Sequence, residues 1–217
     1  MKVSTEACIL GAWIKPNEAQ HVLDIGTGTG LLALMLAQRM SGSIDAVELD
    51  IQAARQADQN VEDSRFSDRI NVIQSDIFDF AHQTNNSYDL IVSNPPFFTN
   101  SQKSEVSVKN KAKHDTASFD KSRLAQALLQ LLSENGQAYV LYPELESKQF
   151  EVEVTKLGLF SKEVLIIRNQ PNGPVFRIVT LVTKKEEDVN VESLNIREGK
   201  THSDHFKKLL SPYYLKL

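Results

Sequence analysis

The tetrapeptide Asn94-Pro95-Pro96-Phe97 has residue types that suit chemistry at a planar nitrogen. An amino group conjugated with a ring or a carbonyl is a poor nucleophile because its lone pair is delocalised. The Asn94 side-chain oxygen and the Pro95 carbonyl can accept its two hydrogens and favour the form that bears the lone pair. The prolines preorganise these acceptors, and Phe97 offers a face for stacking. We therefore predict that all four residues are catalytic. A proline-rich turn is the ordinary alternative.

A glycine loop, Asp24-Ile-Gly-Thr-Gly-Thr-Gly30, lies about seventy residues before this tetrapeptide. Gly26, Gly28 and Gly30 let the backbone turn tightly and approach a ligand without a Cβ in the way. The dinucleotide fingerprint G-x-G-x-x-G fails because Leu31 stands at its last glycine position. The phosphate-loop pattern also fails, because no Lys-Ser or Lys-Thr pair follows the glycines. The loop therefore favours a ligand other than a polyphosphate.

Carboxylates lie at or near the ends of the first three predicted strands: Asp24 precedes the glycine loop, Glu48 ends the second strand and Asp76 follows the third. S-adenosylmethionine (SAM) has an ammonium, a sulfonium, a ribose diol and an adenine, and an acidic crevice lined by glycines suits it. Glu48 can accept the ribose hydroxyls, Asp76 the adenine amino group, and Asp24 can help to hold the methionine end. Ordinary strand-end acids are the alternative, and Asp50 is instead predicted to cap a helix. The predicted cofactor-binding residues are Asp24, Gly26, Gly28, Gly30, Glu48, Asp76 and Asn94.

The hydrophobic pattern alternates between strands and helices. Strands are predicted at residues 21–25, 44–49, 70–73, 88–92, 138–142, 163–167 and 175–183. Helices are predicted at residues 31–40, 51–60 and 119–134, and another helix follows the strand 138–142 and ends at about residue 157. The turn-rich linker 169–174 is too short for a helical crossover, so the last two strands should be antiparallel. Residues 184–188 are predicted to form a solvated loop, and the tail 201–217 a short amphipathic helix. We expect one α/β domain over residues 1–217, with helices on both faces of the sheet.

The composition narrows the class of protein further. The chain has 217 residues, a net charge of −4 and a pI of about 5.8. A protein that binds phosphate backbones is usually basic, so if nucleic acid is the substrate, local basic patches must attract it. Cys8 is the only cysteine and is predicted to be a small buried residue, and no His/Cys cluster has metal-ligand spacing. No apolar run approaches the roughly 20 residues of a membrane span, and no secretory signal is seen. We expect a cytoplasmic, metal-free and monomeric protein.

Two groups of basic residues could contact phosphates. The first follows the tetrapeptide, in a segment, residues 98–118, whose length suggests a functional role. The second lies in the tail, where a solvated surface is the more ordinary interpretation. The first comprises Lys103, Lys109, Lys111, Lys113 and His114, and the second Lys200, His202, His205, Lys207 and Lys208.

The chain resembles the class I SAM-dependent methyltransferases over nearly its whole length, through the glycine loop and Asn94-Pro-Pro-Phe97. That resemblance implies a Rossmann-like, seven-stranded, mostly parallel sheet with an antiparallel last strand. The tetrapeptide is similar to the motif of adenine-N6 and glutamine-N5 methyltransferases. The resemblance is closer to the bacterial tRNA(Val) adenine-N6 methyltransferase group, which implies methylation of the adenosine just 3′ of the anticodon. The stretches that carry it are residues 1–13, 23–39, 45–49, 93–98 and 213–215.

Members of this group carry a short extension, with a basic stretch, upstream of the position of Met1, and we expect that extension to be missing here. Thr5 is expected to cap a helix and Trp13 to lie in the core. Three alternatives stay open: a methyltransferase of a ribosomal RNA adenine, a methyltransferase of a protein glutamine amide, and a non-catalytic module that binds SAM. The glutamine enzymes usually carry an added helical domain, for which this chain has no room.

Overall fold

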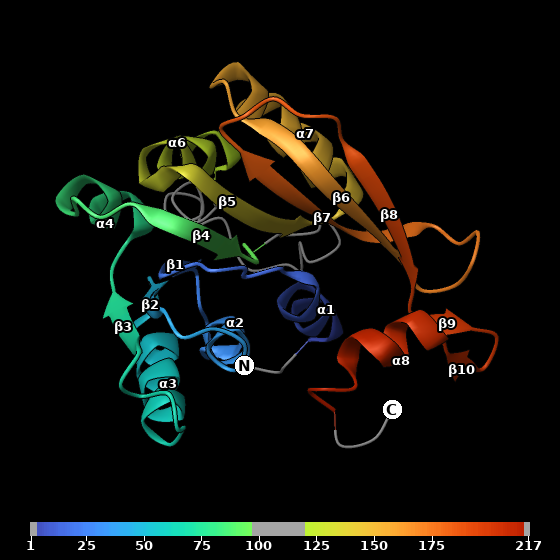
Figure 1. Ribbon diagram of the computed structural model, residues 1–217, viewed down its shortest axis with the longest axis horizontal. Helices are drawn as coiled ribbons and strands as arrows, with labels where there is room; N and C mark the ends of the chain where they lie inside the picture. The colour runs from blue at the N-terminus through green and yellow to red at the C-terminus, as the bar shows by residue number, and fades with distance from the viewer. Residues whose placement is uncertain (1–3, 97–119, 215–217) are drawn as a thin grey trace, which may run out of the picture.

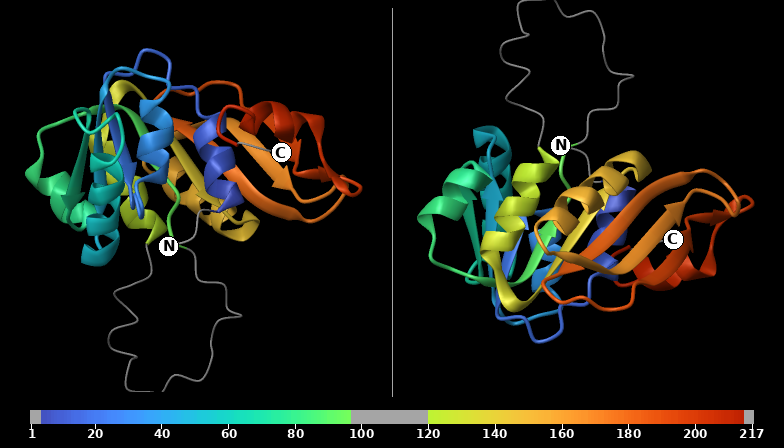
Figure 2. Two further views of the ribbon diagram at one scale, coloured as in Figure 1. Left: turned by 90° about the horizontal axis from the view of Figure 1, so that it is seen from below. Right: turned by 90° about the horizontal axis from the view of Figure 1, so that it is seen from above.

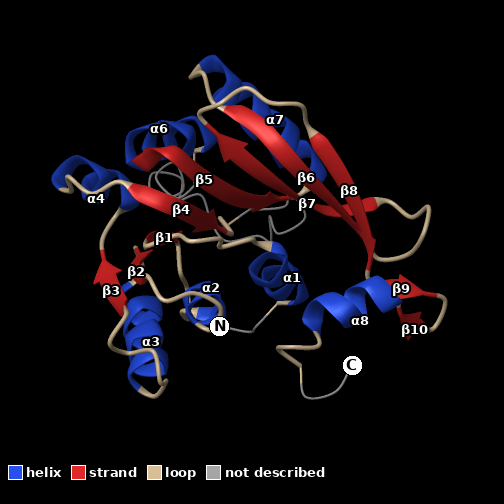
Figure 3. Cartoon of the chain, in the orientation of Figure 1, coloured by secondary structure: helices blue, strands red, loops and turns tan. Residues whose placement is uncertain are grey.

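The structure is a computed structural model that describes residues 4–96 and 120–214. Within these residues, eight strands form one sheet in the order β3-β2-β1-β4-β5-β7-β6-β8 (Figures 1 and 3). β7 runs antiparallel to both of its neighbours, and the other pairs are parallel. The strands are β1 (His21–Ile25), β2 (Ser43–Glu48), β3 (Ile70–Gln74), β4 (Tyr88–Ser93), β5 (Leu132–Tyr142), β6 (Phe160–Arg168), β7 (Val175–Thr183) and β8 (Asn190–Asn195).

Helices cover both faces of the sheet, as predicted (Figure 2). One apolar core lies under α1, α2 and α8, together with the end of α3, and a second core lies under α4, α6 and α7. A small hairpin, β9 (Arg197–Glu198) and β10 (Thr201–His202), precedes α8. The helices are α1 (Thr5–Trp13), α2 (Leu31–Ala37), α3 (Ile51–Glu62), α4 (Ile77–Gln83), α6 (Lys121–Leu131), α7 (Glu144–Lys156) and α8 (Asp204–Leu210).

The predicted number of seven strands is wrong, because β8 adds an eighth strand at the edge of the sheet beside β6. Its sequence, Asn-Val-Glu-Ser-Leu-Asn, has little apolar alternation, and Leu194 is its one buried residue. A backbone edge offered by β6 and a hydrogen bond from Trp13 Nε1 to Glu192 Oε2 (3.1 Å) hold it in place. An edge strand stabilised by such long-range contacts leaves a weak signal in the sequence. The antiparallel pairing of β6 and β7 is confirmed.

Two of the local predictions differ from the structure at element boundaries. The N-cap of α1 is Ser4, whose side chain accepts a hydrogen bond from Ala7 N, so Thr5 is the first helical residue and not the cap. The predicted helix 119–134 ends at Leu131, and β5 begins directly after it. Gly136 lies inside β5, where a Cβ would stand 2.7 Å from the Tyr88 carbonyl oxygen, at a shift in the β4–β5 register. A glycine read as a helix stop therefore serves a close backbone approach.

Other predictions are confirmed. Asp50 caps α3 by accepting hydrogen bonds from Gln52 N and Ala53 N. Trp13 is buried and packs edge-on against Tyr139, with ring centroids 5.7 Å apart. The Cys8 side chain is buried.

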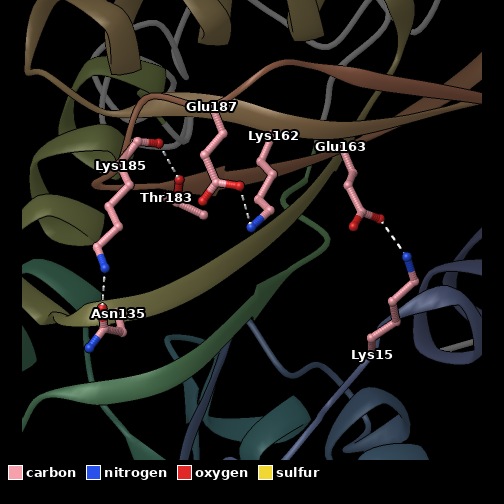
Figure 4. Close-up of polar contacts among 7 residues, drawn as sticks. All are labelled: Lys15, Asn135, Lys162, Glu163, Thr183, Lys185 and Glu187. Atoms are coloured by element: carbon pink, nitrogen blue, oxygen red, sulfur yellow. Dashed lines mark hydrogen bonds and ion pairs between the residues drawn. The ribbon is translucent and has the colours of Figure 1, made fainter.

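The segment between β7 and β8 is an exposed loop, as predicted, and polar contacts anchor it to the sheet (Figure 4). Lys162 Nζ pairs with Glu187 Oε2 at 2.7 Å, and Lys185 Nζ donates to Asn135 Oδ1 at 2.6 Å. In the tail, α8 covers only part of the predicted helix, because β10 occupies its first two positions. Among the described residues, no helix is long and apolar enough to cross a membrane, and no group of His, Cys, Asp and Glu could hold a metal ion.

Candidate active site

The predicted cofactor and catalytic residues that the structure describes, all but Phe97, lie at or just after the carboxyl ends of four adjacent parallel strands. β1 lies between β2 and β4, and β3 flanks β2 (Figure 1). Asp24 on β1 pairs in register with Val92 on β4, and Glu48 at the end of β2 pairs with Gln74 at the end of β3. The strand order reverses between β1 and β4, which is where ligands bind in open α/β sheets. Residues that are far apart in the sequence thus come together along the carboxyl ends of these strands, here called the site edge.

The glycine loop leaves β1 through three left-handed residues. Gly26, Gly28 and Gly30 have φ angles of 71°, 60° and 81°, which explains the requirement for glycine at these positions. At Gly26 a Cβ would meet nothing within 4 Å, so the backbone there faces open space. Gly26 N and Thr27 N donate to the Val47 carbonyl at 2.8 and 3.1 Å. The end of β2 therefore holds the start of the loop in place.

Asp24 is fully buried at the base of this loop. Its Oδ2 accepts from the Thr27 hydroxyl at 2.6 Å and from Ala33 N at 3.2 Å. Its Oδ1 is buried and has no hydrogen-bond partner within the described chain. Burial raises the pKa of Asp24 to about 7, against the lowering effect of the Thr27 and Ala33 hydrogen bonds. A carboxylate held in this way would gain most from a cationic donor at Oδ1.

Glu48 joins the glycine loop to the start of α3. Its Oε2 accepts from Gly28 N and its Oε1 from Asp50 N, both at 2.9 Å. Each oxygen can still accept a second hydrogen, so the pair of hydroxyls on a ribose remains a suitable ligand. These two bonds fix the carboxylate and the loop relative to each other.

Asp76 follows β3 and is the N-cap of α4, where its Oδ1 accepts from Phe78 N at 2.8 Å. The sequence predicted a contact with an adenine amino group, and the structure gives this carboxylate a local structural role as well. Its place at the site edge beside Glu48 is compatible with both roles, and the contact with adenine stays a prediction.

Asn94 follows β4 directly, and its side-chain Oδ1 is buried without a hydrogen-bond partner within the described chain. Pro95 is buried and Pro96 exposed. The preceding Ser93 donates its hydroxyl to the Ile25 carbonyl at 3.0 Å, which ties the end of β4 to the end of β1. An unpaired amide oxygen at this point is an acceptor available for an amino group.

Phe97 and the whole of the first basic group lie outside the described residues. This covers the predictions for Lys103, Lys109, Lys111, Lys113 and His114, and for the segment 98–118. The second basic group is described and lies on the β9–β10 hairpin and α8.

Three side chains at or beside the site edge were not found from the sequence. Thr27 is buried and holds Asp24, and its spacing of three residues from the acid inside a tight loop was an available signal. Leu49 is 60% exposed directly after Glu48, and a large apolar side chain between two acids could have been noticed. Tyr142, at the end of β5, has a buried hydroxyl without a partner in the described chain, and no sequence pattern indicates it.

The donor and acceptor set fits SAM. The site edge offers an orphaned carboxylate oxygen at Asp24, a fixed carboxylate at Glu48, an open backbone at Gly26 and an exposed apolar side chain at Leu49. A ligand with an ammonium, a ribose diol and an apolar ring face would satisfy these groups. Asn94, which directly follows the neighbouring strand β4, has a buried side-chain oxygen with no partner among the described residues.

Comparison with known proteins agrees with a SAM-binding site at the carboxyl ends of these strands. Residues 4–122 match the family model for the methyltransferase small domain. A protein from Trichodesmium erythraeum named tRNA1(Val) (adenine(37)-N6)-methyltransferase is 41% identical, over 100% of this chain and 92% of its own length. A protein of the same name from Photorhabdus laumondii is 38% identical, over 99% of this chain and 89% of its own length.

Two solved structures that are described as methyltransferases share this fold. One described as a predicted O-methyltransferase from Agrobacterium tumefaciens has a TM-score of 0.72 at 16% identity, covering 94% of this chain and 95% of its own. A TehB-like SAM-dependent methyltransferase from Corynebacterium glutamicum has a TM-score of 0.55 at 16% identity, covering 85% and 89%. At these identities the likeness concerns the fold. With the glycine loop, the carboxylates and the family match together, the chain belongs to the methyltransferase small domain family and is a SAM-dependent methyltransferase.

Proposed function

We propose that this enzyme transfers the methyl group of SAM to the exocyclic 6-amino group of an adenosine in tRNA, next to the anticodon of a valine tRNA. The observation that carries the proposal is the buried Oδ1 of Asn94, one strand away from the buried Oδ1 of Asp24, neither of which has a hydrogen-bond partner within residues 4–96 and 120–214. The names of the relatives, which give adenine 37 of tRNA1(Val) as the target, support the choice of substrate.

In this proposal, each residue at the strand ends contacts a different group of the cofactor or of the target base. Asp24 accepts a hydrogen bond from the cofactor ammonium, Glu48 from the ribose hydroxyls and Asp76 from the adenine amino group, while Gly26, Gly28 and Gly30 let the backbone approach. Asn94 Oδ1 and the Pro95 carbonyl accept the two hydrogens of the target amino group. Phe97 stacks on the target base.

SAM supplies a methyl group on a positively charged sulfur. When bound, SAM would give this methyl group to the amino nitrogen, and the electron pair of the broken carbon–sulfur bond would stay on sulfur as a neutral thioether. The new ammonium then loses a proton to water. Asn94 and Pro95 contribute by polarising the N–H bonds and by fixing the nitrogen in line with the breaking bond.

A target adenosine in a stacked anticodon loop has to leave its stack before it can reach the site edge. Because all of these residues come from one chain, we propose that the monomer is the active unit.

The test is transfer of labelled methyl from SAM into bulk tRNA, with ribosomal RNA and a release factor as parallel acceptors. Nuclease digestion and mass spectrometry then map the label. The expected result is N6-methyladenosine in the anticodon loop of a valine tRNA. Label in ribosomal RNA or in a glutamine side chain would overturn the substrate and keep the chemistry. SAM binding without transfer to any acceptor would contradict the proposal itself.

A further inference from the structure

The β9–β10 hairpin and α8 follow the carboxyl end of β8, and Asn94 follows the carboxyl end of β4. β8 runs parallel to β6, and the pairings across the sheet make both parallel to β1 and β4. The carboxyl end of β8 therefore faces the same way as the end of β4, and the chain continues from it into the hairpin (Figure 1). Four strand spacings separate β4 from β8, a lateral distance of about 19 Å.

This region is rigidly held to the sheet. The turn after β6 fixes the hairpin, since Arg197 N donates to the Asn169 carbonyl at 3.0 Å and Gln170 Nε2 to the Gly199 carbonyl at 2.8 Å. Ser203 caps α8 by accepting from Phe206 N at 3.1 Å. Phe206 is buried in the core beneath α1, and the His202 ring stacks on it with centroids 4.7 Å apart. The backbone that carries the exposed side chains is therefore tied to the sheet.

Four basic or titratable side chains on this frame point to solvent: Arg197, Lys200, His205 and Lys208, here called the hairpin–α8 surface. None of the four has an ion-pair partner within the described part of the chain. By contrast, Lys207 pairs with Asp204 at 3.2 Å. Arg197, Lys200 and Lys208 are therefore cations available to an anionic partner.

The charge of the chain is also unevenly distributed. Residues 195–217 contain five Lys or Arg and two Asp or Glu, whereas the other 194 residues contain 19 and 26. Within the described chain, no large apolar side chain between residues 196 and 211 is among the exposed ones. A cationic surface without exposed apolar residues suits a hydrophilic polyanion rather than a membrane or an apolar protein face.

We propose that the hairpin–α8 surface binds the sugar-phosphate backbone of the RNA substrate while the target base is held at Asn94. The inference rests on the proposed function and adds where the body of the RNA lies. A stem-loop presents phosphates along its whole length, so a base inserted at the end of β4 leaves stem phosphates within reach of the end of β8. The contact is to the backbone and carries no base specificity.

The test is a triple variant, Arg197→Gln, Lys200→Gln and Lys208→Gln, assayed with whole tRNA. We expect the KM for tRNA to rise about tenfold or more, with kcat within twofold and the Kd for SAM unchanged. Each lost phosphate contact should also reduce the slope of log affinity against log salt by about 0.7–0.9, so the triple variant should lose roughly two units.

A matched variant, Lys156→Gln, Lys162→Gln and Lys185→Gln, also removes three positive charges. These lysines lie at the amino ends of the parallel strands, near the end of α7, the start of β6 and the loop after β7. The matched variant should leave the KM and the salt slope close to wild type. An equal rise of KM in both variants would reduce the effect to net charge and overturn the proposal, as would an unchanged KM in the first. If wild-type enzyme fails to methylate tRNA at all, the proposed function fails instead.

A measurement on the wild-type protein avoids any effect of the substitutions on folding. Lys200 and Lys208 should be protected by tRNA from amine-specific acetylation, read by mass spectrometry, whereas Lys162 and Lys185 should react equally with and without tRNA. Equal reactivity of Lys200 and Lys208 in both conditions would contradict the proposal.

Discussion

Two carboxylates at opposite ends of the parallel strands, Asp89 and Asp24, differ in how far the fold satisfies their oxygens. At the amino end, Asp89 on β4 has both oxygens occupied: Oδ2 accepts from Gln20 N and His21 N at 3.0 and 3.1 Å, and Oδ1 from the Ser133 hydroxyl at 3.3 Å. At the carboxyl end, Asp24 on the neighbouring strand is fully buried and has one oxygen without a partner in the described chain. Asp89 completes the fold, whereas Asp24 needs a ligand to be satisfied.

The same contrast holds for tyrosines. Tyr88 at the start of β4 donates its hydroxyl to Asp45 Oδ2 at 2.7 Å, while the Tyr142 hydroxyl at the end of β5 is buried and has no partner among the described residues. Leaving a buried polar group unpaired costs about 1–3 kcal/mol. The Ser161 hydroxyl at the start of β6 is also buried without a partner among the described residues, so such groups are not confined to one end of the strands. Where they adjoin the glycine loop or Asn94, we infer that stability is given up for binding and catalysis.

The largest expected effect is at Asn94. Asn94→Ala removes one of the two proposed acceptors of the amino hydrogens and should lower kcat by about 10²–10³. The Kd for SAM, measured by calorimetry, should stay within about twofold. Turnover of this variant near the wild-type value would contradict the proposed role of Asn94 in the mechanism.

Asp89→Ala is the partner experiment at the other end of the strands. It should lower the free energy of unfolding by about 1–2 kcal/mol, because three donors lose their acceptor. The activity per folded molecule should not change. A loss of activity like that of Asn94→Ala would remove the contrast between the two ends.

SAM binding should depend on pH through Asp24. Burial raises the pKa of this carboxyl to about 7, so the unliganded protein takes up a proton there as the pH falls through 7. A protonated carboxyl cannot pair with an ammonium, so the affinity should be full above pH 7 and fall below it, by up to about tenfold per pH unit.

Asp24→Asn should bind SAM roughly 10–100-fold more weakly at pH 8 and with little pH dependence. A wild-type affinity that is flat between pH 5 and 8 would argue against an ionic role. The same raised pKa implies that the contribution of Asp24 to the stability of the unliganded protein is greatest below about pH 4. It declines as the pH rises from there to about 7.

Glu48 should show a smaller effect on the cofactor alone. Glu48→Gln keeps the shape but removes the charge that fixes Gly28 N and Asp50 N, and we expect SAM to bind about tenfold more weakly. The kcat at saturating SAM should change little. A large fall in kcat with unchanged affinity would place Glu48 in the chemistry instead.

The two tyrosines should give the smallest effects, with opposite signs. Tyr142→Phe removes an unpaired buried hydroxyl and should stabilise the unliganded protein by up to about 1 kcal/mol, whereas Tyr88→Phe breaks a hydrogen bond and should destabilise it by about 1 kcal/mol. Urea unfolding of both variants checks the signs. Destabilisation by Tyr142→Phe would show that its hydroxyl is already satisfied.

Local sequence determined the parts of this protein that need only neighbouring residues. The left-handed glycines of the loop, the Asp50 cap and the antiparallel joint before Val175 follow from short-range sterics and hydrogen bonding, and each is found as predicted. The order of glycine loop, acids and Asn94-Pro-Pro is also sufficient to indicate a SAM-dependent methyltransferase.

Tertiary structure decided what depends on strands that are distant in sequence. The strand β8 exists because β6 offers it an edge, and the shift at Gly136 exists because Tyr88 lies against it. The carboxylate of Asp24 differs from that of Asp89 only through what surrounds each of them. The burial of a side chain and its hydrogen-bond partners depend on the assembled sheet. The sequence therefore indicated which side chains are candidates for function, and only the packing showed which of them lack a hydrogen-bond partner.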